Sequence, residues 1–443
     1  ANYQKNICQC IRQWHYSEQN KNSIDMLLAV NGIPVIAIEL KNQLTGQSVD
    51  DAKKQWAYNR NPKEPVFGFN KRILAYFACD LYDVYMTTRL EGPMTNFLPF
   101  NQGSNGAGRD GGAGNPPNPT DGYVTAYFWE NVLQKDKLMD ILQKFISYEK
   151  TEKKEVMPDG STNIKKTEKI IFPRYHQLDV VRELVRHVRE TGPGHNYLIQ
   201  HSAGPGKSNS IAWTAYRMAS LHDANNEAVY DSVIVVTDRR VLDQQLQATI
   251  SSFDHTLGSV ETIDDKKSSK DLLAAINKGK RVIVTTLQKF PVIYEQVQSA
   301  VGKHYAIIVD EAHSSQTGQS AMKLKAALAD VSDALEEYAE LEQKAVDEIE
   351  AKDILVQDML SQGKHKNLSF FAFTATPKGK TLEIFGEPQL DGSFHPFHIY
   401  SMRQAIEEGF ILDVLANYTT YKMCYQIAKN VPDNPDVPTS KAV

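Results

Sequence analysis

The chain has 443 residues, 41% of them hydrophobic, and a formal net charge of −5. This length allows two or three domains, each with its own core, and no apolar run reaches the roughly 18 residues of a membrane-spanning helix. The four cysteines lack the paired spacing of a metal site, so we expect free thiols in a reducing cytoplasm. The chain starts at Ala1 without a methionine or a signal-peptide pattern and ends in a polar stretch, which suggests a piece of a longer protein.

A β-hairpin is predicted near the start of the chain. Two apolar segments, 24–30 and 33–41, flank Asn31-Gly32, and Asn-Gly between apolar strands is a strong hairpin signal. Side chains of a strand alternate between its two faces, so Glu39 and Lys41 share one face. The core-facing side chains of the same segment are then Ile36, Ile38 and Leu40.

The register of this hairpin decides whether Asp25 joins Glu39. A strict two-residue turn pairs Asp25 with Ile38 and sends its side chain to the opposite face. One extra residue, with Gly32 as a left-handed bulge, pairs Asp25 with Ala37 and puts its carboxylate diagonal to Glu39. Two carboxylates beside a lysine can bind Mg²⁺ against a phosphodiester. The alternative is a half-exposed hairpin whose charged residues lie on its solvent-exposed face and have no catalytic role.

Residues 101–122 are rich in Gly, Asn and Pro. Within them, 106–111 fits the Gly-rich pattern of a dinucleotide-binding turn. No strand precedes it, however, and Pro116-Pro117 follows where a helix should start. We therefore predict a long mobile loop. Residues 149–169 are lysine-rich and polar, which indicates a linker or an exposed hairpin.

A phosphate-binding turn is predicted after the strand-like segment 197–200. The turn contains Gly204 and Gly206 and opens a helix, so its backbone N–H groups can surround phosphates together with Lys207. The hydroxyl of Ser208 can reach Mg²⁺. Pro205 has no N–H and removes one donor from this turn.

A second motif completes an ATP site. The apolar run 305–309 is typical of a strand buried in a parallel sheet. Asp310 and Glu311 follow directly, and a carboxylate pair at the end of such a strand can hold Mg²⁺ and orient a water. Either motif alone is weak, but both in this order, about a hundred residues apart, predict an NTPase.

The negative net charge has a local source. Residues 321–362 contain eleven acidic residues and four lysines, a net charge of −7, which leaves about +2 for the rest of the chain. Apolar side chains recur there at three- and four-residue steps, which favours a solvated helical arm over a partner-binding coiled coil. The net charge therefore does not exclude DNA as a partner.

The fold class follows from the order of these elements. From residue 170 to about 416, strand-like runs alternate with helical segments, the signature of an α/β, doubly wound parallel sheet. The residues before 148 form a first unit of strands and helices. The strand-like runs of the second unit are 232–237, 281–286, 305–309 and 369–374.

The arrangement Asp25…Glu39-x-Lys41 resembles the PD-(D/E)xK nucleases. Longer stretches resemble the motor (R) subunit of type I restriction–modification enzymes. These matches run over nearly the whole chain, and they include 39–42 through 55–56, 61–67, 84–90, 201–204, 208–213, 373–379 and 400–410.

The resemblance assigns roles in the N-terminal unit. Asp25 and Glu39 would be metal ligands and catalytic residues, and Lys41 the catalytic lysine. Gln55 would orient DNA or the catalytic residues. The family often has a tyrosine four places after that glutamine, but Asn59 occupies this position and Tyr58 comes one place early, so the role of Tyr58 is open.

It also assigns roles in the ATP lobe. Gln177 resembles the glutamine that recognises adenine, Asp310 would assist the metal, and Glu311 would activate water. Gly204, Gly206, Lys207 and Ser208 would serve the phosphates and Mg²⁺. Residues at strand ends, where open α/β sheets bind ligands, would contact DNA or couple hydrolysis to its movement: Thr237, Arg239, Thr286, Thr374 and Thr376.

The domain order implied by the resemblance is a PD-(D/E)xK nuclease-like α/β domain followed by a RecA-like doubly wound parallel sheet. The function implied is ATP-driven translocation of double-stranded DNA coupled to metal-dependent cleavage. The cofactors would be ATP and Mg²⁺, and the partner a methyltransferase core of modification and specificity subunits. The expected boundaries are 1–148 for the nuclease, 149–169 for the linker, 170–415 for the first RecA-like lobe and 416–443 for the start of a connection to a second lobe.

Two other functions fit parts of the sequence. One is a superfamily 2 DNA helicase or remodeller whose N-terminal domain is only structural. The other is a DNA-binding or assembly scaffold with a defunct ATP site, which Pro205 makes conceivable. Cleavage lost on changing Lys41 excludes the first alternative, and nucleotide turnover excludes the second.

Overall fold

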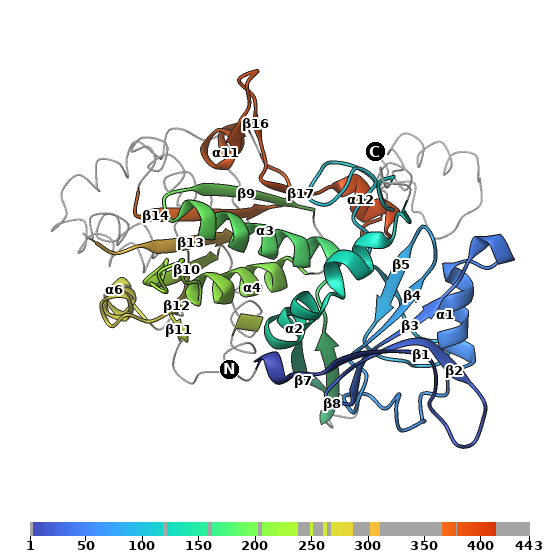
Figure 1. Cartoon of the computed structure of the whole chain (residues 1–443). Coiled ribbons are helices and arrows are strands. Elements are labelled where there is room, and N and C mark those ends of the chain that lie inside the picture. Colours follow the sequence, from blue (N-terminus) through green and yellow to red (C-terminus); the bar gives the residue numbers. More distant parts are fainter. Residues whose placement is uncertain are drawn as a thin grey trace, which may run out of the picture.

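The structure is a computed structural model, and it describes residues 3–117, 122–156, 162–202, 206–237, 249–250, 260–263, 267–286, 302–310, 366–377 and 379–412. Two sheets dominate these residues (Figure 1). Four residues discussed above, Gly204, Pro205, Arg239 and Glu311, lie outside the described residues, as do the acidic segment 321–362 and the expected connection 416–443.

The first sheet has six strands in chain order, β1 to β6. All neighbours are antiparallel except β3 and β4, which run parallel. The parallel pair is joined by the helix α1, which packs on one face of the sheet. The bounds are β1 Cys8–His15, β2 Ser23–Val30, β3 Ile33–Leu40, α1 Val49–Tyr58, β4 Ala75–Cys79, β5 Val84–Thr87 and β6 Leu98–Pro99, with short 3-10 turns at Tyr3–Lys5 and Gln43–Thr45.

Both faces of this sheet are covered, which explains why β3 is apolar on both sides. Ile36 and Ile38 face the core shared with the second sheet, whereas Ala37 packs with Trp56 of α1. Leu40 is 41% exposed, so the prediction that it faces the core was wrong. Leu40 is the last residue of the strand.

The second sheet has seven parallel strands in the order β11-β12-β10-β13-β14-β9-β17. This confirms the predicted α/β class with a parallel sheet. Strands buried on both faces read as continuous apolar runs, and the sequence predicted them for that reason. The bounds are β9 Asn196–His201, β10 Ser232–Thr237, β11 Val260–Thr262, β12 Val282–Thr286, β13 Tyr305–Asp310, β14 Leu368–Thr374 and β17 His398–Tyr400.

Helices lie on both faces of this sheet (Figure 1). The helices α3 and α4 cover the face that continues into the first sheet's core, and α6 and α11 cover the other face. The bounds are α3 Tyr175–Thr191, α4 Lys207–Ala219, α6 Ser269–Asn277, α11 Gly379–Phe385 and α12 Met402–Glu407, with the small strands β15 Glu387–Pro388 and β16 Phe394–His395.

Residues between the two sheets form a helical turn at Phe128–Val132, the helix α2 (Lys135–Lys144) and a hairpin of β7 (Ser147–Val156) and β8 (Thr162–Ile171). Of the two readings of 149–169, the hairpin is the observed one. Phe77 and Phe100 of the first sheet contact Phe172, which follows β8, with ring centroids 5.8 and 6.3 Å apart. The two sheets thus share a continuous core, and the expected domain boundaries stay a prediction.

No helix in the described part of the chain is long and apolar enough to cross a membrane. The cysteines in that part, Cys8, Cys10 and Cys79, are free thiols.

Candidate functional site

The hairpin of β2 and β3 brings Asp25 and Glu39 to one face of the first sheet. Asn31 and Gly32 have φ values of 52° and 80°, as in a strict two-residue turn with two left-handed residues. The pairs Ala29↔Pro34 and Leu28↔Ile36 leave Val35 as an extra residue. Beyond this bulge Met26 pairs with Ile38, so Asp25 lies opposite Glu39.

The expected bulge at Gly32, with Asp25 opposite Ala37, was therefore wrong in position and direction. The extra residue lies inside β3, after Pro34, rather than in the turn. Pro34 has no N–H to give to the ladder, which is a local reason for the irregularity. Asp25 and Glu39 share a face with the expected bulge and with the observed one. A single extra residue, wherever it lies in the hairpin, shifts the pairing by one residue and so moves Asp25 to the face of Glu39.

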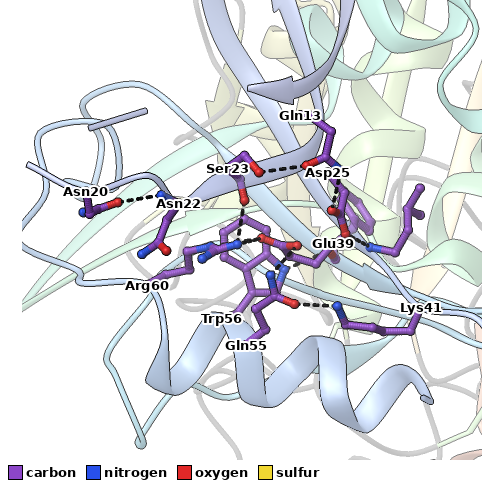
Figure 2. A network of polar contacts seen from close by, with 12 residues as sticks. Gln13, Asn20, Asn22, Ser23, Asp25, Glu39, Lys41, Gln55, Trp56 and Arg60 are labelled. Atoms are coloured by element: carbon purple, nitrogen blue, oxygen red, sulfur yellow. Dashed lines mark hydrogen bonds and ion pairs between the residues drawn. The ribbon is translucent and has the colours of Figure 1, made fainter. Parts of the chain in front are cut away.

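Glu39 is fully buried and bound by two side chains from α1 and its end (Figure 2). Arg60 donates to Glu39 Oε1 from Nε at 3.0 Å and from Nη2 at 2.6 Å. Gln55 Nε2 donates to Oε2 at 2.9 Å. Burial raises the pKa of Glu39 to about 8, Arg60 opposes this rise, and the nearby Asp25 adds to it.

Gln55 connects Glu39 to Lys41. While its Nε2 binds Glu39, its Oε1 accepts a hydrogen bond from Lys41 Nζ at 2.5 Å. The helix α1 fixes Gln55, because a capping box of Ser48 and Asp51 starts the helix. Trp56, the next residue, is buried and donates from Nε1 to Phe77 O at 2.9 Å.

Asp25 is half-buried and held from both neighbouring strands. Gln13 of β1 donates from Nε2 to Oδ1 at 3.0 Å, and the backbone N–H of Leu40 donates to Oδ2 at 2.9 Å. Ser23 in turn donates to Gln13 Oε1 at 2.8 Å. Figure 2 shows these contacts on the same side of the sheet as Glu39 and Lys41.

Sequence reasoning missed Arg60 and Gln13. Arg60 is 4% exposed and also donates from Nη2 to Ser23 O at 2.7 Å. A buried glutamate next to a strand of apolar residues requires such a counter-charge, but the sequence does not say which arginine supplies it. Gln13 has a φ of 49°, rare for a non-glycine residue. Tyr58, by contrast, is 68% exposed.

We call the group of Asp25, Glu39, Lys41, Gln55 and Arg60 the carboxylate site. Its oxygen donors are of the kind that Mg²⁺ prefers, so Asp25 and Glu39 fit a divalent ion. Each of their four carboxylate oxygens already accepts a hydrogen bond. Among the described residues no three His, Cys, Asp or Glu side chains form a ready metal cluster. A bound ion would replace some of these donors.

The candidate residues of the second sheet lie along one edge. Thr237 pairs with Thr286, Asp310 with Phe373, and Thr374 with Gln200. Since all these strands are parallel, Thr237, Thr286, Asp310 and Thr374 end neighbouring strands at the carboxyl edge, where such sheets bind ligands. Thr376 follows two residues on, and its N–H donates to Thr374 Oγ1 at 3.3 Å. We call this the nucleotide edge.

At the nucleotide edge, β9 ends at His201 and α4 begins at Lys207. Gly206 precedes the helix with a φ of +129°, which a side chain rarely adopts. The first N–H groups of an α-helix have no partner within the helix. The start of α4, at Lys207 and Ser208, is therefore of the kind that binds phosphates in other proteins.

Gln177 contacts this turn directly. Its Nε2 donates to Gly206 O at 2.7 Å and its Oε1 accepts from Arg174 N at 2.9 Å, and the side chain is 3% exposed. A Cβ on Gly206 would lie 2.3 Å from Gln177 Nε2. Gln177 thus supports the turn in this structure, and its expected contact with adenine remains a prediction.

Two family models match the chain. The model of the type I restriction enzyme R protein N terminus matches residues 1–94, which contain the carboxylate site. The model of the SWI2/SNF2 ATPase matches residues 176–333, which contain Gln177, Lys207 and Asp310.

Curated relatives agree with these matches. The chain is 26% identical over 313 residues to the type I restriction enzyme HindI endonuclease subunit of Haemophilus influenzae, covering 66% of this chain and 26% of the relative. It is 22% identical over 439 residues to the SauCOLORF180P endonuclease subunit of Staphylococcus aureus, covering 94% of this chain and 37% of the relative. The chain thus spans between a quarter and two fifths of these relatives' length.

Among solved structures, the DEAD-box helicase Mss116 bound to ssRNA and UDP-BeF overlaps 47% of this chain and 36% of its own, at 14% identity and a TM-score of 0.28. The two family models and the curated relatives make the chain similar to the R protein of type I restriction enzymes and, over residues 176–333, to the SWI2/SNF2 ATPases.

Proposed function

We propose that this chain is the nuclease and first motor lobe of a type I restriction endonuclease subunit, which moves double-stranded DNA with ATP and cleaves it at the carboxylate site. The observation that carries the proposal is the convergence of Asp25, Glu39 and Lys41 on one face, with Gln55 bound to both Glu39 and Lys41. The nucleotide edge in the same chain supplies the ATP-dependent half of the activity.

At the carboxylate site, Asp25 and Glu39 would hold a divalent ion, which supplies a water of lowered pKa and stabilises charge on the phosphodiester. Lys41 lies beside the carboxylates and positions the attacked phosphate by its positive charge. Gln55 fixes the Lys41 ammonium group relative to Glu39. Arg60 favours the ionised form of Glu39, the form that a metal ligand requires.

At the nucleotide edge, Lys207 and the amides at the start of α4 would bind phosphates, and Ser208 and Asp310 would bind Mg²⁺. Glu311 would activate water. Gly204, which lies outside the described residues, would also serve the phosphates, and Gln177 supports the turn at Gly206. Thr237, Arg239, Thr286, Thr374 and Thr376 would contact DNA or couple hydrolysis to its movement.

The partners follow from the same proposal. The duplex DNA would be read by a separate specificity subunit within a methyltransferase core, as the similarity to type I restriction enzymes implies. The protein would act in the cytoplasm, where the thiols of Cys8, Cys10 and Cys79 stay reduced.

The test is a comparison of two variants of the intact subunit, assembled with its methyltransferase core. Lys41→Ala should lower metal-dependent cleavage of plasmid DNA by about 10²–10⁴-fold and leave ATP hydrolysis unchanged. Lys207→Ala should abolish ATP hydrolysis. Equal loss of both activities in Lys41→Ala would contradict two separable sites.

The same assays exclude the two alternatives. A remodeller with a structural N-terminal domain would hydrolyse ATP but show no cleavage that depends on Lys41. A scaffold with a defunct nucleotide site would show no ATP turnover that depends on Lys207.

A further inference from the structure

The Gly-rich segment expected as a mobile loop at 101–122 is described over residues 101–117, and these are hydrogen-bonded to β17 and α12 and to the residue between them. It follows β6 of the first sheet and lies against β17 and α12 (Figure 1). Ile399 N donates to Gly108 O at 2.9 Å, and Ser401 Oγ donates to Gly111 O at 2.6 Å. Ala113 N donates to Glu407 Oε2 at 2.7 Å.

Two glycines of this loop lie so close to side chains of β17 and α12 that a larger residue would not fit. Gly108 has a φ of +71°, and a Cβ there would lie 2.8 Å from His398 Cδ2. At Gly112 an added Cβ would lie 2.2 Å from Glu407 Oε2. The glycines that resembled a dinucleotide-binding turn therefore allow a backbone-to-protein contact. The loop packs on its partner through main-chain atoms.

His398, the residue beneath Gly108, belongs to a buried chain of hydrogen bonds. Its Nδ1 lies 3.0 Å from His201 Nε2, and its Nε2 lies 3.2 Å from Asp179 Oδ2 on α3. His201 is the last residue of β9, and both imidazoles are 2% exposed. His398 thus lies between the Gly-rich loop, which it contacts at Gly108, and the end of β9, where it is hydrogen-bonded to His201.

The two ends of the connection from β9 to α4 are hydrogen-bonded to different elements, β17 at Ser202 and α3 at Gly206. At the β9 end, Ser202 N donates to Tyr400 O of β17 at 2.9 Å, beside the His201–His398 pair. At the α4 end, Gly206 O accepts from Gln177 of α3. The position of β17 therefore affects where the phosphate-binding turn begins.

We propose that loop 103–115 is a positioning element for the nucleotide site: by seating β17 and His398 it fixes His201 and Ser202, and so links the nuclease sheet to phosphate binding. This inference rests on the proposed phosphate site at Gly206, Lys207 and Ser208. The link is reciprocal, because a coupling free energy acts in both directions. Nucleotide bound at α4 stabilises the docked loop by the same amount.

The test uses two matched glycines in the intact subunit. Gly108→Ala and Gly114→Ala both place alanine at a left-handed φ, of +71° and +86°, but a Cβ at Gly114 meets no atom within 4 Å. Backbone strain is thus common to both, and only Gly108→Ala displaces His398. We expect Gly108→Ala to weaken binding of a non-hydrolysable ATP analogue about fivefold or more relative to Gly114→Ala, measured by calorimetry.

A second pair removes atoms instead of adding them. Glu407→Ala deletes the acceptor of the loop's Ala113 N–H, and Arg403→Ala deletes only the Arg403–Glu407 pair of 2.8 Å. If Gly108→Ala fails to fold, this second pair of variants still tests whether the loop contact affects nucleotide binding. Glu407→Ala should weaken nucleotide binding and Arg403→Ala should not.

Equal nucleotide affinities within each pair would overturn the inference, even with lowered melting temperatures, since a purely structural loop would change stability alone. The parent subunit and Lys207→Ala are measured alongside. Analogue binding in the parent that Lys207→Ala removes supports the nucleotide site itself. Failure of that control would contradict the proposed function, separately from the role of the loop.

Discussion

The carboxylate site and the nucleotide edge are built by different physical means. The first depends on buried charges that bind one another across β1, β2, β3 and α1, with Arg60 and Glu39 at 4% and 0% exposure. The second depends on parallel register, which brings the ends of β10, β12, β13 and β14 to one edge. Ion pairs and hydrogen bonds between side chains hold the carboxylate site together, whereas strand register holds the nucleotide edge together. Single side-chain substitutions should therefore disturb the structure of the carboxylate site more than that of the nucleotide edge.

Removing Arg60 should have the largest effect. Arg60→Ala leaves Glu39 buried without its ion-pair partner, and breaking a buried pair costs about 3–5 kcal/mol. We expect a large loss of stability above pH 8, where Glu39 is ionised, measured by chemical denaturation, together with loss of cleavage. The control is Lys54→Ala, whose pair with Asp51 is 3.8 Å long and exposed, and which should change neither quantity. A fully stable Arg60→Ala would mean that Glu39 is protonated in the native protein.

Gln55→Ala should lower cleavage about 10–100-fold, the usual cost of losing a group that orients metal ligands. The variant frees Lys41 Nζ and Glu39 Oε2 from a common partner, and ATP hydrolysis should not change. Tyr58→Ala, on the exposed face of the same helix, serves as the comparison in the plasmid cleavage assay. Equal losses in both variants would indicate that α1 acts as a DNA-binding surface and not through the Gln55 bridge.

The pKa of Glu39 predicts a pH effect on stability. It is raised from 4.5 to about 8, so the native state binds more protons than the unfolded state between these values. Stability therefore falls as pH rises through this window, by at most about 1.4 kcal/mol per pH unit. Glu39→Gln removes this titration.

Melting curves in EDTA at several pH values test this effect. The melting temperature of Glu39→Gln relative to the parent should rise from pH 5 to about pH 8 and then level off. A constant difference across the range would show that Arg60 keeps Glu39 ionised throughout.

The smallest effect is expected on ATP affinity, when a single backbone N–H donor is added at the phosphate-binding turn. Pro205→Ser restores a backbone N–H to the phosphate turn, and a hydrogen bond to a charged group contributes about 1.5–3 kcal/mol at most. Rearrangement of the turn offsets part of this gain, so we expect ATP binding to tighten by about tenfold or less, measured by calorimetry. Pro205→Ala restores the same N–H without a hydroxyl and should act alike. Unchanged affinity in both would show that the amide at 205 does not face the nucleotide.

The two regions also differ in how far the sequence predicted them. Strands such as 232–237 and 305–309 were found because burial on both faces leaves continuous apolar runs, and their parallel order then aligns Thr237 and Asp310. That prediction needs only local pattern and topology. The nucleotide edge was predictable for this reason.

The carboxylate site was only partly predictable. Side-chain parity placed Glu39 and Lys41 together, but the bulge was assigned to Gly32, and it lies at Val35. The proline before Val35 was the available signal. Arg60 and Gln13 reach the carboxylates from other elements, and such tertiary contacts leave no local pattern in the sequence.

The most direct measurement of the central claim is metal binding at the carboxylate site. Mn²⁺ is titrated into the intact subunit without nucleotide, and the bound ion is counted by electron paramagnetic resonance. We expect a site in the parent and in Lys207→Ala that is lost in Asp25→Asn. Binding that Asp25→Asn leaves unchanged would contradict the assignment of Asp25 and Glu39 as metal ligands.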